Sequence, residues 1–322
     1  MGYGEYSHAA HVALTTARAP TASVFAQRGC HPLMNPKGVS RESRDSADHP
    51  DSLGVVFALD VTGSMGDIPK KLANQTLPDF MGALLDAGVR DPQVCFMAVG
   101  HAGQDRAPLQ VGQFESSEAL IDQWLTRLYL EGGGAGDHEA YELAMYFCAR
   151  HISLDSVTKR GRRGLLFLTG DVAPNPAVSR VEVERVVGDV NAEDVPIRDM
   201  IDELQRTFEP FFLIAPGAPR TIERAWRDLL GDRVVRLEHA DDTAWVASGL
   251  VALLEGAVPS LGALIRRLSS AGIERQQAAR IARALVPFAA SIGRDDAPPP
   301  PTRGFELPRG DPPSGMTREP SR

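Results

Sequence analysis

Three residues with oxygen-bearing side chains stand at alternate positions in the stretch DVTGSM: Asp60, Thr62 and Ser64. They directly follow LGVVFAL, an apolar run that is typical of a buried β-strand. A turn at the end of a strand can aim such side chains into one pocket, and hard divalent cations prefer oxygen ligands. The stretch therefore predicts a site for Mg²⁺ or Mn²⁺. The same residues also fit a plainer role, in which Asp60 caps the next helix and the two hydroxyls bond to turn amides.

Two further acidic residues are candidates for the same site. Asp171 ends a second apolar run, in RGLLFLTGD, and Asp137 closes the glycine-rich run EGGGAGD. Ligands of open parallel sheets bind beyond the carboxyl ends of the strands, so Asp60 and Asp171 are expected at one edge of the sheet. Asp137 either contributes a ligand or caps the helix expected from HEAYELAMYFCARH, and the sequence leaves both roles open.

The elements that must position these side chains alternate between short apolar runs and amphipathic stretches. Strand-like runs lie at 53–60, 93–100, 163–171, 210–217 and 233–239, and another at 109–115 follows its predecessor closely. The stretches between them place apolar residues at intervals of three and four, as helices do. This order predicts an α/β fold. We expect a Rossmann-like three-layer sandwich with a mostly parallel central sheet, one antiparallel edge strand and helices on both faces.

The segments on either side of this pattern differ in composition. Residues 1–50 form an N-terminal extension with one helical pattern and then an irregular polar stretch, which either packs over the core or is partly mobile. Residues 51–256 form the α/β domain, and 257–292 suggest two further helices as a C-terminal extension. The proline-rich tail, 293–322, is expected to be disordered.

Composition excludes several classes of function. The net charge of −8 and the pI near 5.5 argue against a nucleic-acid partner, because such binding needs an excess of Lys and Arg. No stretch reaches the roughly 18 apolar residues that span a bilayer, and the N-terminus lacks a signal-peptide pattern. The three cysteines suit free thiols because they are widely spaced. We therefore expect a cytoplasmic protein. No Ser/His/Asp order, P-loop or CxxC pair is visible.

The motif DVTGSM, placed after a strand, resembles the Asp-x-Ser/Thr-x-Ser signature of von Willebrand factor type A (VWA) domains. The resemblance covers roughly residues 52–256, including the order of strands and helices. It implies a metal-ion-dependent adhesion site (MIDAS), with Asp60, Thr62 and Ser64 in the first loop. Asp171 matches the acid at a strand end that usually has the sequence LTDG, although this chain has LTGD. The stretch GGGAGDHE is similar to that of a subset of the family and places Asp137 at or near the usual Thr.

This resemblance implies a binding module and not an enzyme. A protein partner would supply an acidic side chain to an open coordination position of the cation. In intracellular bacterial members the partner is often an AAA+ ATPase of the MoxR type or another component of an assembly system. A third carboxylate, from Asp137, would raise cation affinity but leave less positive charge for the partner's acid.

An alternative reading treats the same residues as an enzyme. DVTGS also resembles the Asp-Lys-Thr-Gly-Thr loop of the haloacid dehalogenase superfamily of phosphotransferases. Asp60 would then be the nucleophile and Asp171 would hold magnesium. Two departures weaken this reading. Val61 stands where the family has Lys, and Lys159 is the only candidate near the second motif for holding phosphate.

Overall fold

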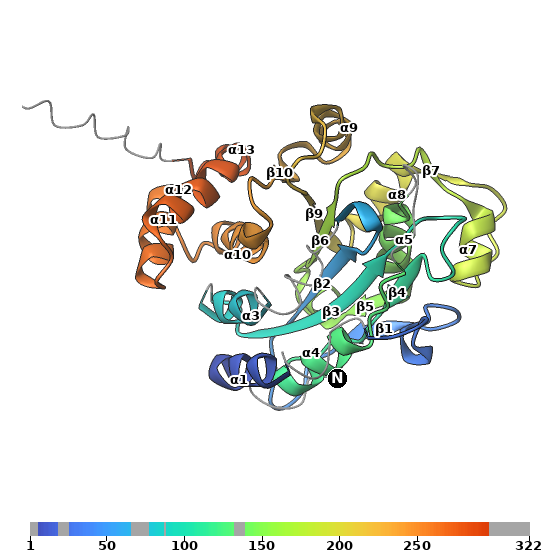
Figure 1. Ribbon diagram of the computed structural model, residues 1–322, viewed down its shortest axis with the longest axis horizontal. Helices are drawn as coiled ribbons and strands as arrows, with labels where there is room; N and C mark the ends of the chain where they lie inside the picture. The colour runs from blue at the N-terminus through green and yellow to red at the C-terminus, as the bar shows by residue number, and fades with distance from the viewer. Residues whose placement is uncertain (1–5, 19–25, 66–76, 87, 132–138, 296–322) are drawn as a thin grey trace, which may run out of the picture.

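The structure is a computed structural model that describes residues 6–18, 26–65, 77–86, 88–131 and 139–295. Its centre is a six-stranded sheet of order β10-β9-β6-β2-β3-β4 (Figure 1). The strands are β2 (Ser52–Asp60), β3 (Asp91–Val99), β4 (Leu109–Val111), β6 (Gly164–Gly170), β9 (Phe208–Ile214) and β10 (Val234–Arg236). Every neighbouring pair is parallel except β3 and β4, which are antiparallel. The predicted sheet and its antiparallel edge strand are therefore confirmed.

Helices cover both faces of this sheet (Figure 1). One face carries α3 (Leu77–Asp86), α4 (Glu118–Thr126) and α10 (Thr243–Leu254). The other carries α5 (Tyr141–His151), α7 (Arg180–Val186), α8 (Ile197–Leu204) and α9 (Arg220–Leu230). Two small strand pairs lie outside the main sheet: β1 (Arg41–Ser43) with β5 (Ile152–Leu154), and β7 (Ala177–Val178) with β8 (Val195–Pro196). The predicted three-layer α/β sandwich is thus confirmed.

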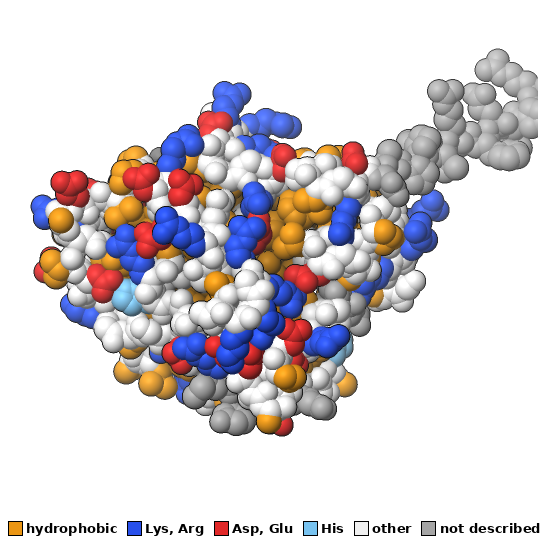
Figure 2. Space-filling model, turned by 180° about the vertical axis from the view of Figure 1, so that it is seen from behind, with side chains coloured by type: hydrophobic (Ala, Val, Ile, Leu, Met, Phe, Trp, Pro, Cys, Tyr) orange, Lys and Arg blue, Asp and Glu red, His pale blue; other side chains and the backbone are white. Residues whose placement is uncertain are grey.

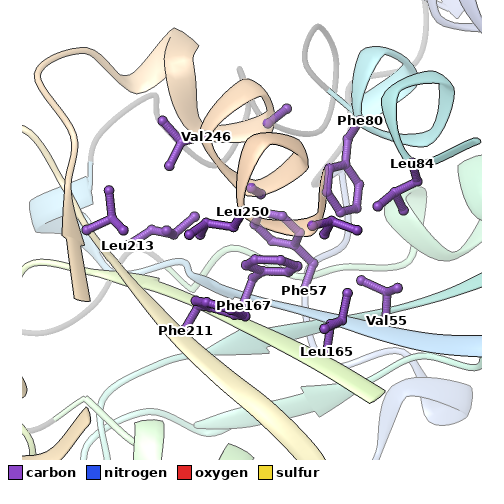
Figure 3. Close-up of a cluster of buried hydrophobic side chains, with 14 of the residues drawn as sticks. Val55, Phe57, Phe80, Leu84, Leu165, Phe167, Phe211, Leu213, Val246 and Leu250 are labelled. Carbon is purple, nitrogen blue, oxygen red and sulfur yellow. The ribbon is translucent and has the colours of Figure 1, made fainter. Parts of the chain in front are cut away.

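Aromatic side chains fill the core between the sheet and α3 with α10 (Figure 3). Phe57, Phe167 and Phe211 come from adjacent strands and stack with ring centroids 5.6 and 5.3 Å apart. Phe80 of α3 meets Phe57 edge-on at 5.5 Å, and Leu250 of α10 covers the same cluster. Each such side chain contributes about 1.5–3 kcal/mol when it is fully buried. This layer fixes the strands whose ends carry the candidate site.

The two faces of β2 are buried against different helices, because successive side chains of a strand point to opposite sides. Val55 and Phe57 join the cluster under α10, whereas Val56 and Ala58 join the cluster under α5. Asp60, the last residue of β2, has the parity of Ala58. Its carboxylate therefore lies on the α5 side of the sheet.

The N-terminal extension packs against the α/β domain where it is described. Strand β1 pairs in parallel with β5, and α1 (His8–Arg18) contacts α3 and α4. A network of ion pairs and hydrogen bonds between side chains holds the segment between β1 and β2 in place. Asp45 accepts hydrogen bonds from Arg160 at 2.8 and 3.1 Å, from Lys159 at 3.1 Å and from Ser52 at 2.7 Å. Both cations belong to α6 (Asp155–Arg160).

Acid should weaken the part of this network that Asp45 forms. Hydrogen bonds from Arg160, together with those from Ser52 and Lys159, hold the pKa of Asp45 well below its usual range, although burial opposes them. A carboxyl whose pKa is lower in the folded protein stabilises the fold above its unfolded pKa, near about 3.9, and this contribution is lost as the pH falls further. The free energy of unfolding in urea, measured at about pH 6 and about pH 3, should therefore fall less on acidification in Asp45→Asn than in wild type. The expected difference is about 1 kcal/mol. Equal losses in the two proteins would show that Asp45 does not carry the effect.

The C-terminal extension shares the core of the domain. It comprises α11 (Leu261–Ser270), α12 (Arg275–Ala284) and α13 (Val286–Ser291). Phe288 meets Phe211 edge-on at 5.4 Å, and Arg280 forms a bidentate pair with the buried carboxylate of Asp242 at 2.6 and 2.9 Å. The second of the two helices expected over 257–292 is divided after Ala284, because Pro287 lacks the N–H that a continuous helix needs. The proline-rich tail from 296 onward lies outside the described residues.

The surface of the protein carries charged side chains of both signs, and its thiols are free. Figure 2 shows basic and acidic side chains interspersed over one face of the molecule. Cys30, Cys95 and Cys148 are free, as predicted, and the last two are buried. In the part of the chain that the structure describes, no helix is both long and apolar enough to cross a membrane.

Candidate metal site

The candidate site lies where the strand order of the sheet reverses. In chain order the strands are arranged 3-2-1-4-5-6, so β2 and β6 are neighbours whose connecting segments leave in opposite directions. Ligand crevices of open α/β sheets form at such a point, beyond the carboxyl ends of the strands. Asp60 ends β2, Thr169 and Gly170 end the neighbouring strand β6, and Asp171 follows directly. The structure therefore brings the two predicted acids, Asp60 and Asp171, to one edge of the sheet.

The carboxylate of Asp60 is fully buried and held at both oxygens. Oδ1 accepts hydrogen bonds from the backbone N–H of Thr62 at 2.9 Å and from the Thr62 hydroxyl at 2.5 Å. Oδ2 accepts one from the hydroxyl of Tyr141 at 2.5 Å. Asp60 thus holds the turn that follows β2. The Thr62 hydroxyl donates its proton to Asp60, and a hydroxyl oxygen is a ligand type that hard cations accept.

Sequence reasoning did not find Tyr141. It is the first residue of α5, is completely buried, and meets Phe212 and Trp226 edge-on at 5.3 and 5.7 Å. Within the run AYELAMYF it has the pattern of a core aromatic residue, and nothing local marks its hydroxyl as part of the site. Its partner Asp60 lies 81 positions earlier in the chain. Only the tertiary fold reveals the contact.

Gly170 explains why this chain has LTGD in place of LTDG. A Cβ atom at position 170 would lie 1.9 Å from the Tyr141 hydroxyl oxygen and 2.4 Å from the ring carbon that carries it. Real Cβ contacts never come this close, so no side chain fits at this position while Tyr141 stays in place. The acid is therefore found one residue later, at Asp171. The tyrosine hydroxyl occupies the space beside Asp60 that an acid at position 170 would need.

The loop that carries Asp171 is anchored on both sides. The indole N–H of Trp226 donates to the backbone oxygen of Val172 at 2.9 Å. The amide of Asn175 donates to the backbone oxygen of Glu139 at 3.1 Å and to the buried carboxylate of Glu142 at 3.0 Å. Asp171 itself is half-buried. The second acid of the site is thus held by contacts to α9 and to the start of α5.

The electrostatics of the site favour a cation. Burial raises the pKa of Asp60 to about 6, and the nearby carboxylate of Asp171 adds to this rise, although hydrogen bonds from Thr62 and Tyr141 oppose it. Burial also raises the pKa of the Tyr141 phenol, with a further rise from Asp60, so this hydroxyl remains a proton donor. Within the described residues Asp60 forms no ion pair. Two neighbouring carboxylates and a hydroxyl oxygen are a donor set that fits Mg²⁺ or Mn²⁺.

The two remaining predicted ligands are Ser64 and Asp137. Ser64 belongs to a short 3₁₀ turn, Gly63–Met65, which follows Thr62 directly, but the placement of its side chain is not described. Asp137 lies outside the described residues. Its alternative role as N-cap of the following helix is wrong, because α5 begins at Tyr141 with Ala140 as its N-cap. In the described ranges no cluster of three or more His, Cys, Asp or Glu side chains has metal-binding geometry.

The structure does not support the alternative function as a phosphotransferase. A nucleophilic carboxylate needs an accessible oxygen, yet Asp60 has no exposed surface and both of its oxygens accept hydrogen bonds. Lys159, the candidate for holding phosphate, instead contacts Asp155 at 2.7 Å and Asp45 at 3.1 Å. These acids lie on α6 and before β2, and thus at the opposite edge of the sheet.

That opposite edge carries a Ser/His/Asp cluster, which the sequence alone did not reveal. His49 contacts Asp91 through Nδ1 at 3.4 Å and Ser116 through Nε2 at 3.3 Å, beside a pocket of about 280 Å³. Both contacts are longer than the usual 2.7–3.0 Å, about the range needed for efficient proton transfer. The other oxygen of Asp91 accepts the backbone N–H of Asp51 at 2.9 Å. The cluster fastens the segment before β2 to β3 and to the start of α4.

No protein-family model matches the chain, and no curated protein matches it either. Solved structures with a similar arrangement include the pilus adhesin SpaC from Lactobacillus rhamnosus GG in its open conformation. It has 10% sequence identity and a TM-score of 0.46, and the match covers 68% of this chain but only 31% of the adhesin.

Two other similar structures carry the words vWF or MIDAS in their descriptions. The vWF domain of the type V pili tip protein Mfa5 from Porphyromonas gingivalis has 8% identity and a TM-score of 0.41, with 64% of this chain and 95% of that domain covered. Proximal thread matrix protein 1 from the mussel byssus, with a zinc-occupied MIDAS motif, has 11% identity and a TM-score of 0.34, with 66% and 50% covered. A von Willebrand factor domain is thus among the solved structures to which this chain is similar.

Proposed function

We propose that this chain is a VWA-type domain that binds one divalent cation, Mg²⁺ or Mn²⁺, and uses it to hold a protein partner. The observation that carries this proposal is the buried carboxylate of Asp60, placed beside Asp171 at the strand-order reversal and without an ion pair among the described residues. An unpaired buried charge is costly, and a cation compensates it. The motif DVTGSM supports the same function.

The residues of the site would supply different kinds of ligand to the cation. Asp60 and Asp171 supply negative charge, and Thr62 supplies a hydroxyl oxygen whose proton is already given to Asp60. We propose Ser64 and Asp137 as the remaining protein ligands. When bound, the cation offers a positive charge and an open coordination position to an oxygen ligand from outside.

The charge balance supports an acidic side chain as that outside ligand. Position 170 bears no acid, and the neutral hydroxyl of Tyr141 stands in its place. Asp60 and Asp171 together neutralise a divalent cation without reversing the sign of the site, whereas Asp137 as a third carboxylate leaves less positive charge for the partner's acid. We propose a cytoplasmic partner protein that contributes a carboxylate. An AAA+ ATPase of the MoxR type is the first partner to test, by asking whether its binding is lost in EDTA.

Titration calorimetry with Mg²⁺ and Mn²⁺ tests the cation site. Wild type is expected to bind one cation, whereas Asp60→Ala should bind at least about 100-fold more weakly, because the central carboxylate of the site is gone. Asp232→Ala removes an exposed acid that pairs only loosely with Arg227, at 3.6 Å, and should bind as wild type does. Circular dichroism checks that each variant is folded. Unchanged affinity in folded Asp60→Ala would refute the assignment of the site.

A further inference from the structure

We propose that Tyr141 sets the cation affinity of the site, because its hydroxyl competes with the cation for Asp60. This inference rests on the proposed function and concerns the same site. Its starting point is the 2.5 Å hydrogen bond from the Tyr141 hydroxyl to Oδ2 of Asp60. A proton donor and a metal ion use the same lone pairs of a carboxylate, so a bond to one weakens the bond to the other.

Asp60 has little bonding capacity left for a cation. A carboxylate offers about four lone-pair positions. Three of them already accept hydrogen bonds: two from Thr62 to Oδ1 and one from Tyr141 to Oδ2. Asp60 can therefore give a cation one further lone pair, on Oδ2, as long as Tyr141 keeps its bond. A bidentate contact through both oxygens requires the phenol to move away.

The packing around Tyr141 resists such a movement. The ring is completely buried and lies edge-on against Phe212 and Trp226, which themselves stack at 3.9 Å. The absence of a side chain at Gly170 leaves just enough room for the hydroxyl beside the end of β6. Tyr141 therefore stays within hydrogen-bonding distance of Asp60, and its competition with the cation is permanent.

A functional consequence follows from this competition. With Asp60 partly satisfied by Tyr141, the cation alone is held weakly. A carboxylate from the partner then adds a strong ligand at the open position, so cation and partner bind more tightly together than either does alone. Tyr141 would thus make stable cation binding depend on the partner.

Tyr141→Phe removes the hydroxyl and keeps the ring, so it tests the competition directly. We expect it to bind Mn²⁺ about tenfold more tightly than wild type in titration calorimetry, since one charge-assisted hydrogen bond to Oδ2 no longer has to be weakened. Tyr146→Phe is the matched control. Tyr146 lies on the same helix, is also buried, and donates to a carboxylate outside the site, Asp189, at 2.8 Å.

A second readout uses the unmodified protein. If Mn²⁺ or Mg²⁺ weakens the bond between Tyr141 and Asp60, binding should change the tyrosine ultraviolet difference spectrum of wild type and of Tyr146→Phe. The change should be lost in Tyr141→Phe. This spectrum keeps the inference testable should Tyr141→Phe fold poorly, because a cation that binds wild type without any tyrosine signal contradicts the competition.

The outcomes separate this inference from the proposed function. Tighter binding in Tyr141→Phe alone supports the inference, also when binding to wild type is too weak to detect. Equal or weaker binding in Tyr141→Phe overturns it, while binding to wild type leaves the cation site intact. If wild type, Tyr141→Phe and Tyr146→Phe all fail to bind either cation, the proposed function fails and the inference with it.

Discussion

Trp226→Ala is expected to lower the free energy of unfolding by about 3–5 kcal/mol. Trp226 has no exposed surface, stacks on Phe212 with ring centroids 3.9 Å apart, and lies edge-on against Tyr141. Truncation to alanine removes this packing, leaves a cavity under α9, and deprives the backbone oxygen of Val172 of its N–H donor. Urea unfolding followed by circular dichroism measures the loss.

The same substitution should also weaken the cation site, because the loop that carries Asp171 loses its anchor on α9. Trp226→Phe separates the two contributions. It keeps a stacked ring on Phe212 and loses the hydrogen bond, so it should cost about 1 kcal/mol for that bond. A loss below about 1 kcal/mol in Trp226→Ala would mean that the stack does not hold this part of the core.

Gly170→Ala is the second variant with a large expected effect. Its Cβ would lie 1.9 Å from the Tyr141 oxygen, and the ring cannot retreat because Phe212 and Trp226 close the space behind it. Overpacking of this kind typically costs about 1–3 kcal/mol, and more where neighbours cannot shift. We therefore expect a loss of about 3 kcal/mol or more in urea unfolding, together with a broken bond between Tyr141 and Asp60.

Two comparisons identify the cause of this loss. Gly29→Ala places a Cβ where no atom lies within 4 Å, so it should leave stability within about 0.5 kcal/mol of wild type. In the double variant Gly170→Ala with Tyr141→Ala, the clash is absent. The combined loss should then be clearly smaller than the sum of the two single losses. Additive losses would show that Gly170 is needed for a reason other than Tyr141.

The sheet could be predicted from the sequence because its strands carry strong local signals. Runs such as LGVVFAL and GLLFLTG are buried on both faces, and an acidic residue stands directly after each. That change of composition also located Asp60 and Asp171, since both stand at strand ends. The small elements were harder to predict. Strand β1 forms only because residues 41–43 meet β5, which lies more than a hundred positions later.

The local chemistry of the site could be predicted only in part. The turn from Asp60 to Thr62 is encoded by neighbours in the chain, so the motif predicted it. Tyr141 joins the site through a long-range contact, and its hydroxyl is invisible in an apolar helix pattern. The order LTGD appeared to be a departure from LTDG without a cause, until the distance from position 170 to Tyr141 supplied one. Tertiary packing determined both features.

In the proposed function, one divalent cation binds between the ends of β2 and β6. Crystals grown with Mn²⁺, with diffraction data collected at the manganese absorption edge, test it most directly, because anomalous scattering locates the ion without any assumption about ligands. We expect a single anomalous peak in coordination contact with the Thr62 hydroxyl and with the carboxylates of Asp60 and Asp171, directly or through water. A peak elsewhere, or none at this edge of the sheet while Asp60 keeps both its hydrogen-bond partners, would contradict it.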